Sequence, residues 1–190
     1  MSRFWTAALT VVICSVIPAT ATTYPPVTFD ELVARADVIF LGEVIDVRPF
    51  PLPTRDGTII KTRVTFRVSD AIWGTTAALE VFDFFGGEWG GIGMAIADMP
   101  AFAVGDRRVV FAYRDSRTIN PIVGFTQGLL QIVRDSSGVD RVLTSDGMPL
   151  DRPESIGASR AAVSAAPAVP MRLTEFRSRI SRALAEARRR

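Results

Sequence analysis

The chain has 190 residues, with 22 lysines and arginines against 20 aspartates and glutamates, and no histidine. Its single cysteine is Cys14, so the residues beyond position 21 have no disulfide, no thiol nucleophile, no imidazole base and no Cys or His metal ligand. The nearly balanced charge also argues against the strongly basic surface typical of nucleic-acid binding.

Residues 1–21 have the pattern of a cleavable secretory signal peptide. Arg3 supplies the positive charge, the run from Phe4 to Ile17 is mainly apolar, and Ala19-Thr20-Ala21 fits the small-x-small cleavage rule. The run is shorter than the roughly 20 apolar residues that a membrane span needs. We therefore expect cleavage near Ala21 and an exported, soluble domain, periplasmic or extracellular, without an integral membrane span. An uncleaved anchor is the alternative.

A short helix is the first element that the sequence predicts after the signal. Thr28 is a good N-cap, and Glu31, three residues later, completes a capping box. Val27 and Leu32 occupy the positions of a hydrophobic staple across the same helix start. The helix should run from about Phe29 to Ala36.

Alternating apolar and polar residues then predict strands, the longest of which passes through Val64 and ends near Trp73. Asp56-Gly57 is a turn signal before that strand. Five or six strands at this spacing predict a mainly β fold, a barrel or a sandwich. The expected strands cover residues 38–47 with a bend at Gly42, then 63–73, 79–85, 108–113, 122–134 with an interruption, and 139–143. Pro49, Pro51 and Pro53 should keep the chain extended after the first strand without donating hydrogen bonds.

Composition divides the chain beyond the signal into three parts. Residues 22–144 are expected to form the β domain, and residues 145–170, rich in Ala, Pro, Ser and Gly, a linker. Residues 171–190 predict a separate C-terminal amphipathic helix with one apolar stripe. We expect this stripe to dock on the β domain, with a partner protein or a membrane surface as alternatives. The stripe consists of Leu173, Phe176, Ile180, Ala183, Leu184 and Ala187.

The segment Ala36–Val44, ADVIFLGEV, follows the short helix and precedes the long strand that closes with Trp73-Gly74. This arrangement resembles the opening of netrin-like domains, which include the tissue inhibitors of metalloproteinases and are built on an OB-type barrel. Gly105-Asp106-Arg107 and Gly124–Gly128 are similar to segments of uncharacterised exported bacterial proteins. The resemblance covers about Thr28 to Leu143 and implies a five- to six-stranded OB-like (netrin-like) barrel.

The chain departs from this family at the residue that inhibits proteases. The animal inhibitors present an N-terminal cysteine to the protease zinc and are held by disulfides. The expected mature start here is Thr22-Thr23, so the inhibitory residue has no counterpart in this chain.

The glycine-rich stretch Gly86–Gly93 is the candidate binding site. It lacks the Gly-Lys-Ser/Thr ending of a phosphate-binding loop and opens no evident helix, so nucleotide binding is not expected. Glu88 and Trp89 lie at its centre, and an exposed aromatic beside an acid on such a loop suits recognition of a partner. Over this recognition role we favour a structural loop with glycines at positive φ and with Trp89 as a cap on the barrel.

Carboxylates are the remaining candidates for acid–base chemistry, and a glycosidase needs only two that are suitably spaced. Any loop-rich domain supplies such a set, so we predict no catalytic residue, no metal ligand and no cofactor. The acids from Asp135 to Asp140 lack the ligand spacing of a calcium loop and indicate a plain hairpin turn. Strand aromatics such as Phe66 and Phe111 are expected in the core rather than stacked on bases. The candidate acids in one long connection are Asp83, Glu88, Asp98 and Asp106.

The sequence therefore predicts an exported, non-enzymatic binding or interaction domain. The expected partner is another exported protein and not a nucleic acid. An inhibitor or accessory protein of a secreted metalloprotease is the first alternative, and a carboxylate-dependent hydrolase is the second.

Overall fold

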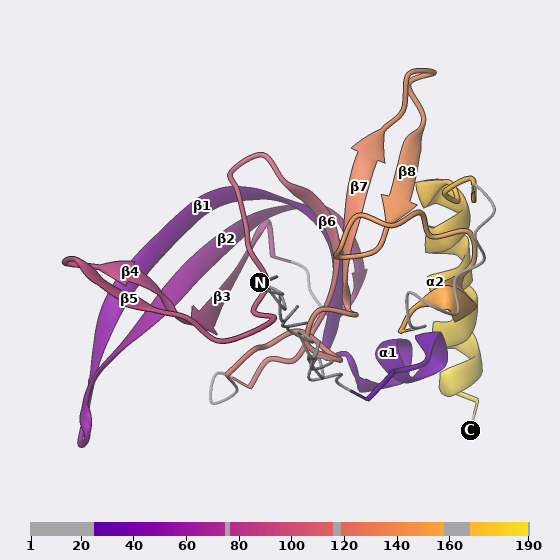
Figure 1. Cartoon of the computed structure of the whole chain (residues 1–190). Helices are drawn as coiled ribbons and strands as arrows, with labels where there is room; N and C mark the ends of the chain where they lie inside the picture. The colour runs from indigo at the N-terminus through magenta and orange to yellow at the C-terminus, as the bar shows by residue number, and fades with distance from the viewer. Residues whose placement is uncertain (1–24, 75–76, 116–118, 158–167, 190) are drawn as a thin grey trace, which may run out of the picture.

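The computed structural model describes residues 25–74, 77–115, 119–157 and 168–189. They form one antiparallel sheet of six strands in the order β3-β2-β1-β6-β7-β8, a two-stranded ribbon, β4-β5, and helices on one side of the sheet (Figure 1). The expected signal peptide with its cleavage position lies outside the described residues. Within them, no helix is long and apolar enough to cross a membrane. The elements are α1 (Phe29–Arg35), β1 (Val38–Thr54), β2 (Gly57–Trp73), β3 (Leu79–Phe85), β4 (Gly87–Trp89), β5 (Ile92–Met94), β6 (Arg107–Ala112), β7 (Leu129–Arg134), β8 (Asp140–Leu143), η1 (Pro153–Ser155) and α2 (Leu173–Ala187).

The sheet is open, and the expectation of a closed OB-type barrel is wrong. Closure would require β3 to pair with β8, but the outer edges of both strands bind other segments of the chain. The backbone of Val142 in β8 donates a hydrogen bond to Met171 (3.1 Å) and accepts one from Leu150 (3.2 Å). The backbone of Phe85 in β3 donates one to Ile119 (3.1 Å). The mainly β class and the six strands of the sheet agree with the prediction.

The predicted N-terminal helix is confirmed, and so is the reason for its position. The Thr28 hydroxyl accepts a hydrogen bond from the Glu31 N–H (3.2 Å), and the Glu31 carboxylate accepts one from the Thr28 N–H (2.9 Å). This capping box satisfies backbone donors that the first turn leaves without partners. Leu32 and Val33 on the inner side of α1 are buried.

β1 is longer than predicted, because it continues through three prolines that pair with β2. Pro49, Pro51 and Pro53 lie opposite Thr62, Ile60 and Thr58. They occupy every second position of the strand, where the donor that proline lacks would point away from β2. This half of β1 pairs only with β2 among the described strands, because β6 extends no further along β1 than Glu43.

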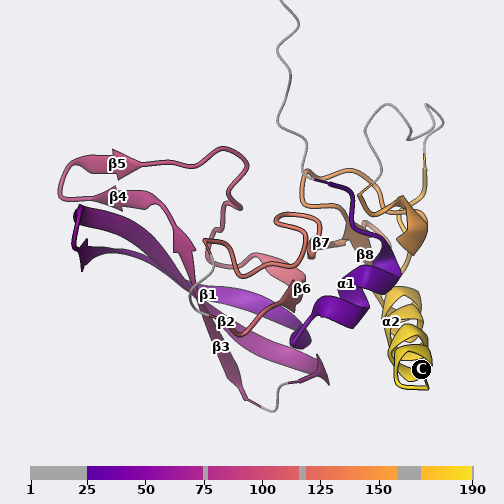
Figure 2. The same cartoon turned by 90° about the horizontal axis from the view of Figure 1, so that it is seen from below.

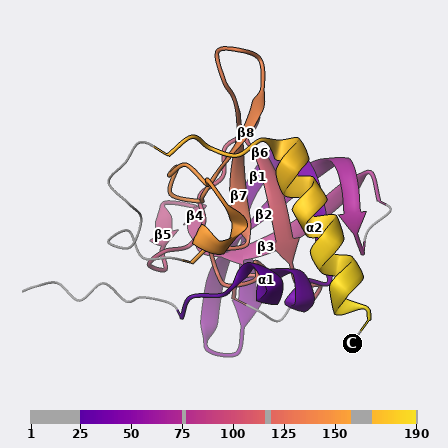
Figure 3. The same ribbon diagram turned by 90° about the vertical axis from the view of Figure 1, so that its right-hand side faces the viewer.

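The sheet separates two apolar cores, because alternate residues of its central strands point to opposite faces. Helices α1 and α2 cover one face, with Ile39 of β1 and Phe111 of β6 buried in the core beneath them (Figure 3). On the other face, Phe66 packs against Phe40 and against Phe102 from the connection between β5 and β6, with ring centroids 5.6 and 5.8 Å away. The strand aromatics Phe66 and Phe111 are therefore core residues, as predicted.

Helix α2 packs on the sheet and is not a separate unit. Phe176 and Ile180 of its apolar stripe are fully buried. The Phe176 ring lies 5.7 Å from that of Phe29 in α1 and 6.4 Å from that of Phe111 in β6. Docking of the stripe on the domain is therefore confirmed, whereas the description of the helix as separate is wrong.

The first part of the segment predicted as a linker, residues 145–170, belongs to the fold. Leu150 is fully buried and Ile156 is 5% exposed, both in the core beneath the helices. A backbone bridge between Leu143 and Pro149 brings the chain back to the edge of β8. These apolar residues reach the core singly, from turns and a short 3₁₀ helix, so they leave no periodic signal in the sequence.

Asp140, at the start of β8, binds two arginines of neighbouring strands. Its carboxylate accepts two hydrogen bonds from Arg107 of β6 (2.9 and 2.8 Å) and one from Arg134 of β7 (3.1 Å). The hydrogen bonds from Arg107 above all, and then from Arg134, lower the pKa of Asp140 from 3.8 to about 2.

The stability of this part of the sheet should depend on the pH. Because the folded pKa lies below the unfolded one, the stabilisation by Asp140 is present above about pH 4 and is lost as the pH falls towards 2. We expect Asp140→Asn to be less stable than wild type at pH 7, with a difference that shrinks between pH 4 and pH 2 in urea unfolding. Asp56→Asn, in the exposed turn between β1 and β2, is the control. A difference that stays constant over this range would contradict the assignment.

Candidate functional site

The glycine-rich stretch, which the sequence predicts as a loop, forms a small hairpin. Trp89 of β4 lies directly opposite Ile92 of β5. Gly90 and Gly91 make the turn between them with φ values of +59° and +80°, which glycine adopts without a steric penalty. The hairpin lies beside the far end of β1 and β2, away from the helices (Figure 2).

Trp89 is exposed, so its interpretation as a cap on a barrel is wrong. Its exposed fraction is 50% and that of Ile92 is 66%, and Glu88 is exposed as well. The base of the hairpin is fixed, because the hydroxyl of Thr62 in β2 donates a hydrogen bond to the Gly86 carbonyl (2.7 Å). The hairpin thus presents an aromatic, an aliphatic and an acidic side chain on a support anchored to the sheet.

The four candidate carboxylates do not gather at one place. Asp83 lies in β3 and accepts two hydrogen bonds from Arg63 (2.8 and 2.9 Å). Asp106, just before β6, pairs with Arg108 of that strand, Glu88 is in the hairpin, and Asp98 lies in the connection between β5 and β6. In the part of the chain that the structure describes, no three His, Cys, Asp or Glu side chains are grouped to hold a metal ion.

The acids around residue 138 form a hairpin turn, as predicted. Asp135 accepts hydrogen bonds from the Ser137 hydroxyl (2.6 Å) and from the backbone N–H groups of Ser137 and Val139 (both 2.9 Å). Its other oxygen accepts one from Arg141 (2.8 Å). The hydrogen bonds from the Ser137 hydroxyl and Arg141 foremost hold the pKa of Asp135 well below its usual range. This carboxylate therefore shapes the turn.

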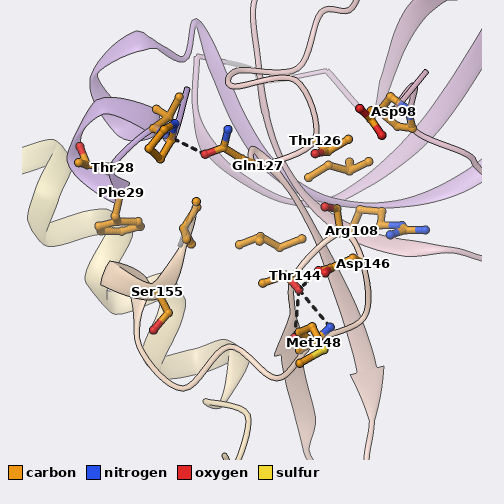
Figure 4. Close-up of a pocket in the computed structure, with 18 of the residues that line it drawn as sticks. Thr28, Phe29, Asp98, Arg108, Thr126, Gln127, Thr144, Asp146, Met148 and Ser155 are labelled. Carbon is orange, nitrogen blue, oxygen red and sulfur yellow. Dashed lines mark hydrogen bonds between the residues drawn. The ribbon is translucent and has the colours of Figure 1, made fainter. Parts of the chain in front are cut away.

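A groove of about 1120 Å³ lies on the domain, and its lining includes no residue of the hairpin (Figure 4). Its walls are the start of α1 (residues 26–30), the connection 98–101, the turn 144–149 and the segment 154–157. Met99, Pro100 and Met148, which are half-buried, contribute apolar surface, whereas Leu129 and Leu130 at the start of β7 are only 1% exposed. We call this feature the groove below.

The polar side chains of the groove connect its walls to one another. The Gln127 amide oxygen accepts a hydrogen bond from the Val27 N–H (2.8 Å), and its NH₂ group donates one to the Pro25 carbonyl (3.2 Å). The Thr144 hydroxyl accepts a hydrogen bond from the Met148 N–H (3.1 Å) (Figure 4). These bonds join the entry of α1 to the β6–β7 loop and close the 144–149 turn. They hold the groove in a fixed shape.

Arg108, the one cation of the described groove lining, is matched inside the protein. It is 8% exposed and donates a hydrogen bond to Asp106 (2.7 Å). Burial raises the pKa of Asp106, but the hydrogen bonds from Arg108 and from the Ala103 N–H outweigh this effect, so the pKa is lowered. The Arg108 charge therefore serves an internal ion pair.

The backbone on two sides of the groove is strained. Asp98 and Phe125 have φ values of +61° and +67°, and no other non-glycine residue in the described ranges has positive φ. Buried Asn120 holds Phe125 in place, because its NH₂ group donates to the Phe125 carbonyl (3.3 Å) and its oxygen accepts from the Ile122 N–H (2.9 Å). Such strain costs about 1–3 kcal/mol per residue and is concentrated at functional sites in proteins.

The lining of the groove is acidic. Four of its described residues carry carboxylates, whereas its only described cation is Arg108, which Asp106 already matches. At neutral pH the groove therefore presents negative charge around apolar surface. The four are Asp30, Asp98, Asp146 and Glu154.

Among the residues that line the groove, sequence reasoning singled out only Asp98 as a candidate functional residue. The walls come from a helix start, two connections and the segment predicted as a linker, which have no periodic pattern of their own. Asp106 and Arg108, two residues apart after Gly105, were the one local signal of a buried ion pair. Its meaning depends on burial, which the sequence does not show.

Comparisons with known proteins found no match. No family model, curated protein or solved structure matches this chain. The resemblance of residues 28–143 to netrin-like domains therefore remains a hypothesis, and the function is inferred from the geometry of the chain itself.

Proposed function

We propose that this chain is an exported, non-enzymatic binding domain that holds a segment of another exported protein in the groove. The observation that carries the proposal is the groove itself, whose walls come from segments far apart in the sequence. Its volume of about 1120 Å³, just above the upper end of the roughly 300–1,000 Å³ usual for small-molecule pockets, is large enough for a short chain segment. Export is inferred from the signal-peptide pattern of residues 1–21.

The charge of the groove defines the chemistry of the partner segment. Four carboxylates and a matched arginine favour lysine or arginine side chains. The half-buried apolar residues Met99, Pro100 and Met148 favour an apolar residue beside those cations in the partner segment. The polar side chains that connect the walls are hydrogen-bonded within the protein, which supports binding rather than catalysis.

The double substitution Asp98→Asn and Asp146→Asn tests this proposal. It removes two negative charges and keeps the side-chain shapes, so the fold should be unaffected. We expect the affinity for a partner captured from the native exported fraction to fall about tenfold, because each exposed charge pair contributes roughly 0.5–1 kcal/mol. Calorimetry with the purified partner measures this change.

The control is the double substitution Asp46→Asn and Asp56→Asn, which removes the same charge from the β1–β2 hairpin. It should leave the affinity unchanged. Equal affinities for wild type and the groove variant would contradict the proposal. Loss of a hydrolytic activity in the groove variant, with binding retained, would favour the carboxylate-dependent hydrolase instead.

An inhibitor or accessory protein of a secreted metalloprotease is the second candidate, and the β4-β5 hairpin favours it. Protein inhibitors bind through protruding, rigid segments, and aromatic anchors contribute most of the energy at such interfaces. Trp89 and Ile92 protrude together at the turn, and the hairpin base is hydrogen-bonded to β2.

Trp89→Ala distinguishes binding through the hairpin from binding in the groove. Because Trp89 is half exposed, the free energy of unfolding should change by no more than about 0.5 kcal/mol. If the hairpin binds a protease, the affinity should fall by about 2 kcal/mol or more. Leu79→Ala is the matched control, since Leu79 is also 50% exposed but lies in β3. Urea unfolding and inhibition of a secreted zinc protease are the measurements, and unchanged inhibition by the Trp89 variant would exclude the hairpin.

A further inference from the structure

A second cavity, of about 210 Å³, lies between helix α2 and the sheet. Leu41 of β1, Ile72 of β2 and Val109 of β6 line it from the sheet. It is separate from the groove, with which it shares no lining residue. The helix side is lined by Leu173, Phe176 and Ile180, with Thr174 and Arg177.

The inner part of this cavity is wholly apolar. Val109, Phe176 and Ile180 are fully buried, whereas Leu41, Ile72 and Leu173 are partly exposed. Within the described residues, every buried side-chain nitrogen or oxygen has a hydrogen-bond partner. The cavity is partly open to solvent, but its apolar walls offer a water molecule few of the 2–4 polar partners that it needs.

An ion pair contributes the only charges in the described lining of the cavity. Arg177 of α2 forms two hydrogen bonds with Asp70 of β2, one of them 3.1 Å long from Nη2 to Oδ1. Each charge is matched by the other, so an ionised ligand would have to break this pair in order to gain a partner. The chemistry of the cavity therefore favours an uncharged ligand.

We propose that this cavity is a binding site for a small, uncharged, apolar molecule of the size of one aromatic ring or a short alkyl chain. A dry cavity of about 150 Å³ in another protein binds benzene. The cavity beneath α2 has about 210 Å³, enough for a single ring with a small substituent. The ligand would contact α2 and the sheet together, so its binding stabilises the docked position of the helix.

Benzene added to the full-length chain tests this site. Because benzene binds the folded state only, the melting temperature should rise by about 3–6 °C at ten times the Kd. Calorimetry should give one site per chain. Benzoate, a charged molecule of similar size, should give no shift, and a larger shift with benzoate than with benzene would overturn the proposal of an uncharged ligand.

Two substitutions that fill the cavity locate the binding. Leu173→Phe at the start of α2 and Val109→Ile in β6 each add volume to the lining, and the second adds only one methylene. The benzene shift should disappear in the first and be reduced in the second. Val133→Ile, which adds the same methylene on an exposed part of β7, should keep the full shift. No shift in wild type, or a full shift in both filled variants, would overturn the proposal.

Discussion

Phe176→Ala should lower the free energy of unfolding by about 3–5 kcal/mol, the usual cost of removing a buried phenylalanine ring. Phe176 is fully buried, and its ring contacts the rings of Phe29 in α1 and Phe111 in β6. The substitution therefore removes the contact through which α2 joins both the other helix and the sheet. The midpoint of urea unfolding, monitored by circular dichroism, measures the effect.

Arg182→Ala is the control for this prediction. Arg182 lies in the same helix on its exposed side, and alanine has a higher helix propensity than arginine. The free energy of unfolding should change by no more than about 0.5 kcal/mol. A Phe176 variant as stable as this control would show that α2 does not pack on the sheet, and would also remove the cavity proposed beneath it.

Gly74→Ala should destabilise the protein by more than about 3 kcal/mol, because two penalties, a left-handed backbone angle and a steric clash, combine at this position. Gly74, after the end of β2, has a φ of +67°, and a Cβ at this position would lie 1.9 Å from the Asp37 carbonyl oxygen. That oxygen belongs to the backbone just before β1, so it cannot rotate away. Arg114 donates hydrogen bonds to the Gly74 carbonyl (3.0 Å) and to the buried Glu80 (3.1 Å), so a shift would also disturb β3.

Gly90→Ala separates the two penalties. Gly90, in the turn of the β4-β5 hairpin, has a similar φ of +59°, but a Cβ there would meet no atom within 4 Å. Its substitution should cost only about 1 kcal/mol, from the left-handed backbone alone. Urea unfolding of both variants measures the difference. Equal losses would mean that the close approach between β2 and the start of β1 is not part of the folded state.

The elements that local interactions determine were predictable from the sequence. The capping box of Thr28 and Glu31 needs only residues three apart, and it places the start of α1 correctly. Alternation around Val64 needs only the two-residue period of a strand, and the turn at Asp56-Gly57 needs only its own backbone. The bend predicted at Gly42 corresponds to an irregularity of the β1–β2 pairing between Leu41 and Gly42.

The candidate site was predicted less well, because exposure depends on the rest of the fold. Glu88 and Trp89 were identified by their position among glycines, but the pairing of Trp89 with Ile92 in a hairpin was not. Of the residues that line the groove, only Asp98 was named from the sequence as a candidate for chemistry, whereas Val27 and Thr28 were named only for the start of α1. The others are brought together by contacts between segments up to about a hundred residues apart, such as the hydrogen bond from Val27 to Gln127.

The sequence alone determined where the chain forms its main helices and strands, since those depend on neighbours within a few residues. Only the tertiary structure decided whether the sheet closes, where α2 packs and what the segment after β8 does. An edge strand can pair with any free backbone, and here Leu150 and Met171 occupy the outer side of Val142 in β8. The same apolar stripe on α2 suits a partner, a membrane or the sheet. The apolar surface buried around Phe176 stabilises the packing of α2 on the sheet. The hydrophobic effect depends on the apolar area that is buried and not on the distance between residues along the sequence.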